Sequence, residues 1–146
     1  MSVIEKQKKI VKEFQEMTDW EHRYKSIIER GKQLEQMPES FKVDENLVKG
    51  CQSRVWIFAK LNPDNTIRFF ADSEAMIVRG LVAVLLQVYS NEKPDEILSS
   101  PPTFIKELGF EGNLSPSRAN GLYSMVKQIQ FYATAFQALV ASQTKN

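Results

Sequence analysis

The chain has 146 residues, of which 19 are basic and 18 are acidic, so its formal net charge is +1, and it holds one cysteine and one histidine. One thiol excludes an internal disulfide. It also excludes a zinc site or an iron–sulfur cluster held by this chain alone, because such sites take four cysteine or histidine ligands. The near-neutral charge gives no electrostatic reason to expect nucleic acid or an anionic membrane as a partner. Hydrophobic residues make up 42% and charged residues 25%, as in a globular protein, and the length favours a single domain, 1–146.

The amino terminus carries charge throughout and lacks the uninterrupted apolar stretch of a signal peptide. The most apolar segment, Ala75 to Tyr89, is interrupted by Arg79, Gly80 and Gln87 and is too short to span a bilayer. With a free thiol and no export signal, we expect a cytoplasmic protein in a reducing compartment.

Two amphipathic helices are predicted at the start of the chain. Apolar residues recur at helical spacing over 4–17 and again over 20–34. Between the two stripes, Thr18 and Glu21 fit a capping box, which predicts that the second helix begins at Thr18. His22 lies on the polar side of this helix, and we interpret it as a surface residue.

The following segment predicts an antiparallel hairpin. Pro38 is expected to end the second helix, after which the helical periodicity disappears. Side chains alternate over 54–61, the Asn-Pro-Asp-Asn sequence at 62–65 favours a type I turn, and 66–71 forms the returning strand. A third strand around residues 43–50 is expected to widen this small sheet to about three strands.

A nearly continuous apolar run over 75–88 predicts a central, buried helix, with Asp72 or Ser73 as its N-cap. Gly80 lies inside the run and lowers helix stability by about 1 kcal/mol relative to alanine, so it indicates a close contact with a neighbouring element. Short helical pieces follow, and the Ser-Pro pair at 115–116 opens the last helix. Helices packed on an antiparallel sheet make an α+β fold.

Cys51 is the main candidate for chemistry. A free cysteine is usually a buried, inert small hydrophobe. This one lies in a loop pattern before the first strand, next to Gly50 and polar residues, with Lys49 and Arg54 within three residues. Cations near a thiol favour the thiolate, which is the nucleophilic form, but the sequence leaves open whether these two point at the sulfur.

Other candidate residues carry weaker signals. The chain has no glycine-rich phosphate loop, no G-x-S-x-G elbow and no H-E-x-x-H motif. A Cys51/His22 dyad is disfavoured because His22 is interpreted as solvated. Arg118 places a cation in the first turn of the last helix, where the helix dipole disfavours it, and this indicates an anionic partner in either a structural salt bridge or a functional contact.

Three sequence blocks resemble the SufE family of cysteine desulfuration proteins. The resemblance runs in order from the first helix to the last, and it implies a fold like that of the U-type iron–sulfur scaffold proteins, in agreement with the α+β pattern. The blocks are Gly50-Cys51-Gln52-Ser53 before Val55-Trp56, Asp72-Ser73 with Ala75, Ile77-Val78 and Gly80-Leu81, and Leu114-Ser115-Pro116-Ser117-Arg118 with Gly121-Leu122.

The resemblance implies a sulfur acceptor. Members of this family take sulfane sulfur from the persulfide of a SufS-type cysteine desulfurase, a pyridoxal-phosphate enzyme, and pass it to an iron–sulfur scaffold complex. On this chain the acceptor is then Cys51, at a loop tip that shelters the sulfur, and the chain needs no cofactor and no metal. U-type scaffolds hold their cluster with three cysteines, so a single cysteine favours relay. The chain is then a sulfur-transfer partner and not an independent enzyme.

The sequence leaves two other functions open. A non-covalent allosteric activator would open the desulfurase active site without carrying sulfur. An independent Cys/His hydrolase would depend on His22, which neither of the other functions requires.

Overall fold

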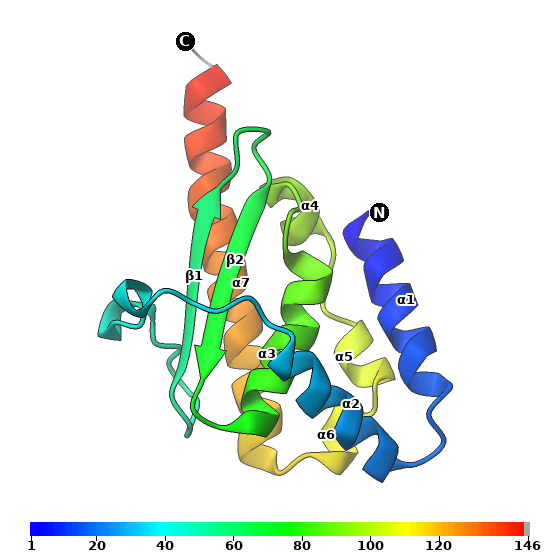
Figure 1. Ribbon diagram of the computed structural model, residues 1–146. Helices are drawn as coiled ribbons and strands as arrows, with labels where there is room; N and C mark the ends of the chain where they lie inside the picture. Colours follow the sequence, from blue (N-terminus) through cyan, green and yellow to red (C-terminus); the bar gives the residue numbers. More distant parts are fainter. Residues whose placement is uncertain (145–146) are drawn as a thin grey trace.

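Helices surround an antiparallel hairpin in the computed structural model, which describes residues 1–144 (Figure 1). The α+β class predicted from the sequence is confirmed. The elements in chain order are α1 (Val3–Gln15), α2 (Trp20–Lys32), two 3-10 turns (Glu39–Phe41 and Asp44–Asn46), β1 (Val55–Leu61), β2 (Ile67–Ser73), α3 (Met76–Tyr89), α4 (Pro94–Ser99), α5 (Phe104–Glu107), α6 (Phe110–Asn113) and α7 (Pro116–Thr144).

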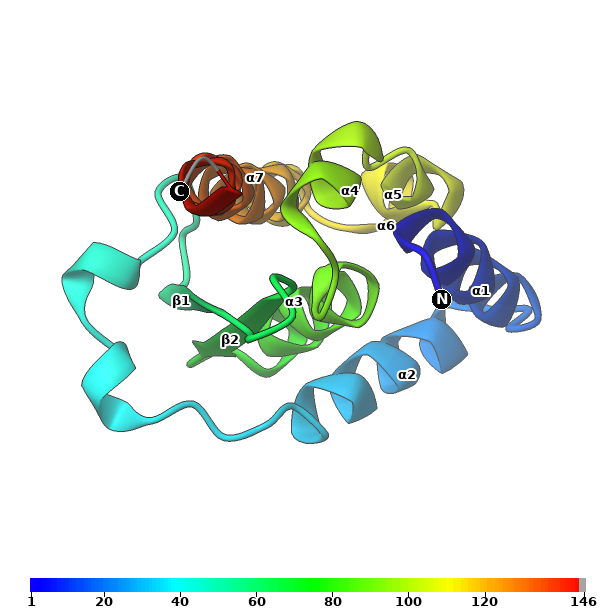
Figure 2. The same ribbon diagram turned by 90° about the horizontal axis from the view of Figure 1, so that it is seen from above.

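The central helix α3 packs against β2 on one side and against α2 on another, as predicted from its continuous apolar sequence. Helix α7 packs against β1, α3 and α4, and Figure 2 shows it on the opposite side of the hairpin from α2. The carboxyl-terminal part of α7 extends beyond the hairpin (Figure 1). In the part of the chain that the structure describes, no helix combines the length and the apolar character needed to cross a membrane.

The hairpin follows the alternation in the sequence. β1 and β2 pair antiparallel, with Ile57 opposite Ala71 and Phe58 opposite Phe70. Successive side chains of a strand point to opposite faces, so Ile57 and Ala71 enter the main core while Phe58 and Phe70 belong to a small second cluster. The strands are joined at the turn predicted for 62–65.

The third strand predicted around residues 43–50 is wrong, since the sheet has two strands among the described residues. The segment touches the sheet through one antiparallel bridge, between Leu47 and Trp56. Upstream of this bridge, the side-chain amide of Asn46 donates to the carbonyl of Phe41 at 2.7 Å. Such a bond between a side chain and the backbone competes with strand pairing, and the segment forms 3-10 turns instead.

Helix α2 is shorter than predicted at both ends. Its N-cap is Asp19 and not Thr18, because the Asp19 carboxylate accepts a hydrogen bond from the amide of His22 at 2.7 Å. The helix ends at Lys32, well before Pro38. His22 is exposed in the first turn, as predicted.

The predicted N-cap of α3 is also wrong. Ala75 occupies the cap position without a side-chain hydrogen bond, and Asp72 and Ser73 belong to β2. The nearly buried carboxylate of Asp72 forms ion pairs with Lys42 at 2.6 Å and with Arg79 at 3.1 Å. Lys42 comes from a distant segment and Arg79 from α3 itself, so the Asp72 carboxylate is engaged in ion pairs and does not cap the helix.

Gly80 allows α2 and α3 to cross in direct backbone contact, which confirms the close approach predicted for it. A Cβ atom at Gly80 would lie 2.1 Å from the carbonyl oxygen of Ile27, and one at Gly31 would lie 2.8 Å from the amide nitrogen of Gly80. Arg79 reinforces the crossing, since its Nε donates to the carbonyl of Gly31 at 2.8 Å. The two helices therefore form a rigid unit.

Candidate functional site

The Cys51 loop joins the Leu47 bridge to β1 and lies against the first turns of α7. Gly50 has φ +94°, in the left-handed region that favours glycine. A Cβ atom at Gly50 would also lie 2.6 Å from the side-chain oxygen of Ser124 on α7. The Gly-Cys sequence thus turns the loop tightly and brings its backbone onto the helix.

The Cys51 side chain is half-buried against a second glycine, Gly121 of α7. Its Sγ donates a hydrogen bond to the carbonyl oxygen of Gly121 at 3.5 Å. Burial raises the pKa of the Cys51 thiol above its ordinary value, because a charged thiolate is poorly solvated there. In this conformation the sulfur is therefore held as the neutral thiol.

A cavity of about 310 Å³ opens beside Cys51. Its polar lining comes from the loop and from the start of α7, and its apolar lining comes from α3 and from Met125 of α7. This space exceeds many times the roughly 30 Å³ share of a water molecule in liquid water, so it has room for a second sulfur atom on Cys51. The cavity is lined by Cys51, Gln52, Ser53, Val78, Leu81, Ser115, Ser117, Arg118, Gly121 and Met125.

The two cations next to Cys51 in the sequence do not line this cavity. Arg54 forms an ion pair with Glu74, and its guanidinium lies 5.2 Å from the ring centre of Trp56. Lys49 is exposed to solvent. The stabilisation of a thiolate by Lys49 and Arg54, which sequence proximity suggested, is therefore absent from this conformation.

Arg118 is the cation that the fold does bring to the cavity. Ser115 caps α7 as predicted, with its Oγ accepting from the amide of Arg118 at 3.3 Å. The Arg118 side chain is exposed, and within residues 1–144 no carboxylate lies at ion-pair distance from it. A guanidinium beside the amino-terminal end of a helix favours an anion. The functional alternative for Arg118 thus gains support over a structural salt bridge.

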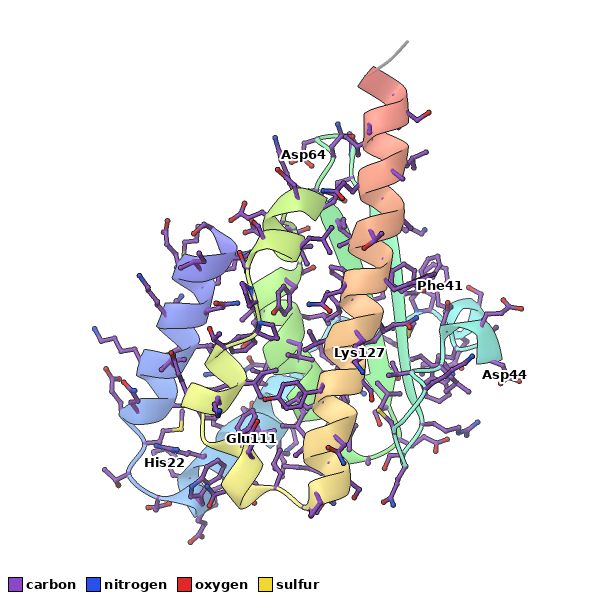
Figure 3. All side chains as sticks on the ribbon, turned by 180° about the vertical axis from the view of Figure 1, so that it is seen from behind. His22, Phe41, Asp44, Asp64, Glu111 and Lys127 are labelled. Carbon is purple, nitrogen blue, oxygen red and sulfur yellow. The ribbon has the colours of Figure 1, made fainter. Side chains whose placement is uncertain are left out.

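His22 and Cys51 are not brought together. His22 is exposed at the start of α2 and is not part of the Cys51 cavity. Figure 3 shows it at the edge of the molecule, away from Lys127 of α7. Among the described residues, no group of three or more His, Cys, Asp and Glu side chains is placed to hold a metal ion.

Sequence reasoning did not anticipate the contact between Gly121 and the Cys51 sulfur. Gly121 lies 70 residues from Cys51, and in the sequence it stands out only as part of a motif shared with the SufE family. A glycine near the start of a long helix is a signal for close approach, just as Gly80 was, but the sequence does not say which segment approaches it.

Residues 8–133 match the family model of SufE, the Fe-S metabolism associated domain. A protein of Synechocystis sp., described as an uncharacterized SufE-like protein, is 44% identical over 129 residues, which cover 88% of this chain and 80% of that protein. The solution structure of a hypothetical protein from Thermus thermophilus has the same fold, with a TM-score of 0.77 and 21% identity over 91% of this chain and 96% of that chain. The chain belongs to the SufE family, whose domain is associated with iron–sulfur metabolism.

Proposed function

We propose that this chain accepts sulfane sulfur onto Cys51 from a SufS-type cysteine desulfurase and passes it on to an iron–sulfur scaffold complex. The observation that carries the proposal is the position of the single cysteine, half-buried on the wall of a cavity of about 310 Å³. Membership of a family associated with iron–sulfur metabolism supports it. The chain then acts as one domain and a partner of the desulfurase, in the reducing cytoplasm where a thiol persists.

The transfer is an exchange between the Cys51 thiol and the donor's persulfide. The Cys51 thiolate attacks the outer sulfur of the donor's cysteine persulfide, and a new S–S bond forms as the donor's S–S bond breaks. The donor cysteine leaves as a thiolate and takes up the proton that Cys51 released. No external oxidant or reductant is needed, and pyridoxal phosphate acts earlier, on the desulfurase.

The resting site supports a protected carrier that is activated on docking. Because burial raises its pKa, the Cys51 thiol reacts slowly while it stays half-buried against Gly121. Arg118 lines the same cavity and offers a positive charge to a thiolate or a persulfide anion. Shelter also limits oxidation, to which exposed thiolates are prone.

Mass spectrometry tests the proposal. After incubation with desulfurase and cysteine, the wild-type peptide containing Cys51 should gain one sulfur atom, roughly 32 Da, and Cys51→Ser should gain none while keeping its circular dichroism spectrum. His22→Ala serves as the control, because a relay makes no use of this exposed side chain, and it should load normally. Sulfur uptake by Cys51→Ser would contradict the proposal.

The same experiment separates the proposal from a non-covalent activator. An activator predicts that Cys51→Ser still stimulates cysteine turnover by the desulfurase and that the wild type gains no mass. The cavity beside Cys51 favours carriage, since an activator has no need for room around a thiol.

A further inference from the structure

We infer that Gly121 is a positioning residue for sulfur transfer, which holds Cys51 in its sheltered conformation until a partner releases it. The inference rests on the proposed role of Cys51, and it adds a second residue that determines when this thiol reacts. Three features of the contact between α7 and the loop support it: the missing side chain at Gly121, the hydrogen bond of the thiol, and the free space beside the sulfur.

The first feature is the absence of a side chain at Gly121. This residue is buried, and a Cβ atom there would lie 3.3 Å from Sγ, 3.9 Å from Cα and 4.0 Å from Cβ of Cys51. Ordinary van der Waals contacts of such an atom begin near 3.4 Å. Glycine is therefore the residue that lets the sulfur contact the helix backbone without any displacement of the Cys51 side chain.

The second feature is the hydrogen bond that this approach makes possible. The Cys51 Sγ–H donates to the carbonyl of Gly121 at 3.5 Å. A carbonyl oxygen only accepts, so this bond exists for the neutral thiol and is lost when the thiolate forms. Burial acts in the same direction, because it raises the pKa of the thiol. Both effects keep the seated sulfur protonated and unreactive.

The third feature is the free space beside the sulfur, in the cavity that Cys51 and Gly121 both line. The cavity of about 310 Å³ borders both Cys51 and Gly121, so the sulfur has room to give way to a methyl group at position 121 without the backbone being forced apart. This distinguishes Gly121 from Gly80, where an added Cβ would meet a backbone carbonyl. Gly121→Ala should therefore leave the fold intact and move the thiol away from the carbonyl of residue 121.

Alkylation of the purified protein by iodoacetamide, without any desulfurase, tests the inference. In Gly121→Ala, Cys51 should react about twofold faster or more at neutral pH, and the pH profile of the rate should shift to lower pH, because a displaced thiol is less buried and has lost its carbonyl acceptor. Gly121→Ser, with a larger side chain, should show a greater increase than Gly121→Ala.

Gly112→Ala is the matched control, because a Cβ atom at Gly112 has no neighbour within 4 Å. It should react like the wild type. Circular dichroism and thermal unfolding report whether each variant is folded, and helix propensity favours alanine over glycine at 121. An unchanged or slower alkylation rate in a folded Gly121→Ala variant would overturn the inference.

Failure of this inference and failure of the proposed function give different results. Alkylation needs no partner and reports only on the exposure and protonation of the Cys51 thiol. The mass gain after incubation with desulfurase reports on sulfur carriage. If wild-type Cys51 gains no sulfur, the proposed function falls and with it the link from Gly121 to sulfur transfer, even where the alkylation rates differ. If wild-type Cys51 gains sulfur and the alkylation rates of the wild type and Gly121→Ala are the same, only the role of Gly121 is refuted.

Discussion

Two glycine contacts in this molecule look alike and differ in what surrounds them. At the crossing of α2 and α3, a Cβ atom at Gly80 would meet the backbone carbonyl of Ile27 at 2.1 Å. Where the Cys51 loop contacts α7, a Cβ atom at Gly121 would lie 3.3 Å from the Cys51 sulfur, with a cavity beside it. The first contact joins two helix backbones that cannot yield, and the second joins a helix to a side chain that can move.

Close approach by glycine can therefore serve either rigidity or release. Packing leaves no spare volume where two regular elements touch through their backbones. Where a loop side chain touches a helix next to free space, the same absence of a Cβ atom gives a contact that can be undone.

The largest effect is expected from Gly80→Ala. The added methyl group would overlap the carbonyl of Ile27, so the helices must separate, and we expect a loss of about 3 kcal/mol in the free energy of unfolding. Urea denaturation followed by circular dichroism measures this loss. Gly112→Ala again serves as the control. If Gly80→Ala proved as stable as the wild type, the crossing would not be the rigid contact described here.

A smaller loss is expected from Asp72→Asn, which weakens the ion pairs that tie β2 to Lys42 and Arg79. The carboxylate is nearly buried, while the two cations are partly exposed and can turn to water, so we expect a loss of about 2 kcal/mol. Denaturation in urea at pH 7 measures it. Glu74→Gln removes one exposed ion pair, which solvent screens, and should cost less stability than Asp72→Asn. Equal losses in the two variants would contradict the difference in burial.

On the movable side, Arg118→Gln should slow sulfur uptake from the desulfurase by about tenfold, which corresponds to about 1.4 kcal/mol of lost anion stabilisation. Its stability should stay within about 0.5 kcal/mol of the wild type, because the side chain is exposed. Lys127→Gln, an exposed cation on the same helix that is not part of the cavity lining, is the control and should load at the normal rate (Figure 3). Equal rates for the two variants would remove Arg118 from the mechanism.

The smallest effect concerns pH. Burial raises the pKa of the Cys51 thiol in the folded state, so the folded protein retains this proton at a pH where the unfolded chain has released it. Stability therefore falls slightly as the pH rises through the range between the unfolded and the folded pKa. The difference in thermal midpoint between the wild type and Cys51→Ser, followed from pH 7 to about pH 10, isolates this contribution from other titrating groups. A difference that stays constant with pH would contradict a buried resting thiol.

Sequence predictions were accurate where neighbours within a few residues decide the structure. The alternation in β1, the turn before Thr66, the apolar run of α3 and the Ser115 cap of α7 all appear as predicted. The predicted caps at Thr18 and Asp72 failed because another acceptor or a distant cation competed for the same groups.

The sequence by itself determined the α+β class, the family and the single thiol that makes Cys51 the candidate acceptor. Only the tertiary structure decided that Gly121 seats the sulfur, that Arg118 lines its cavity, and that Lys49 and Arg54 do not. The physical reason is distance along the chain. Periodicity, turns and caps depend on contacts over a few residues, whereas the contact between Cys51 and Gly121 spans 70 residues and exists only after α7 has packed beside the loop.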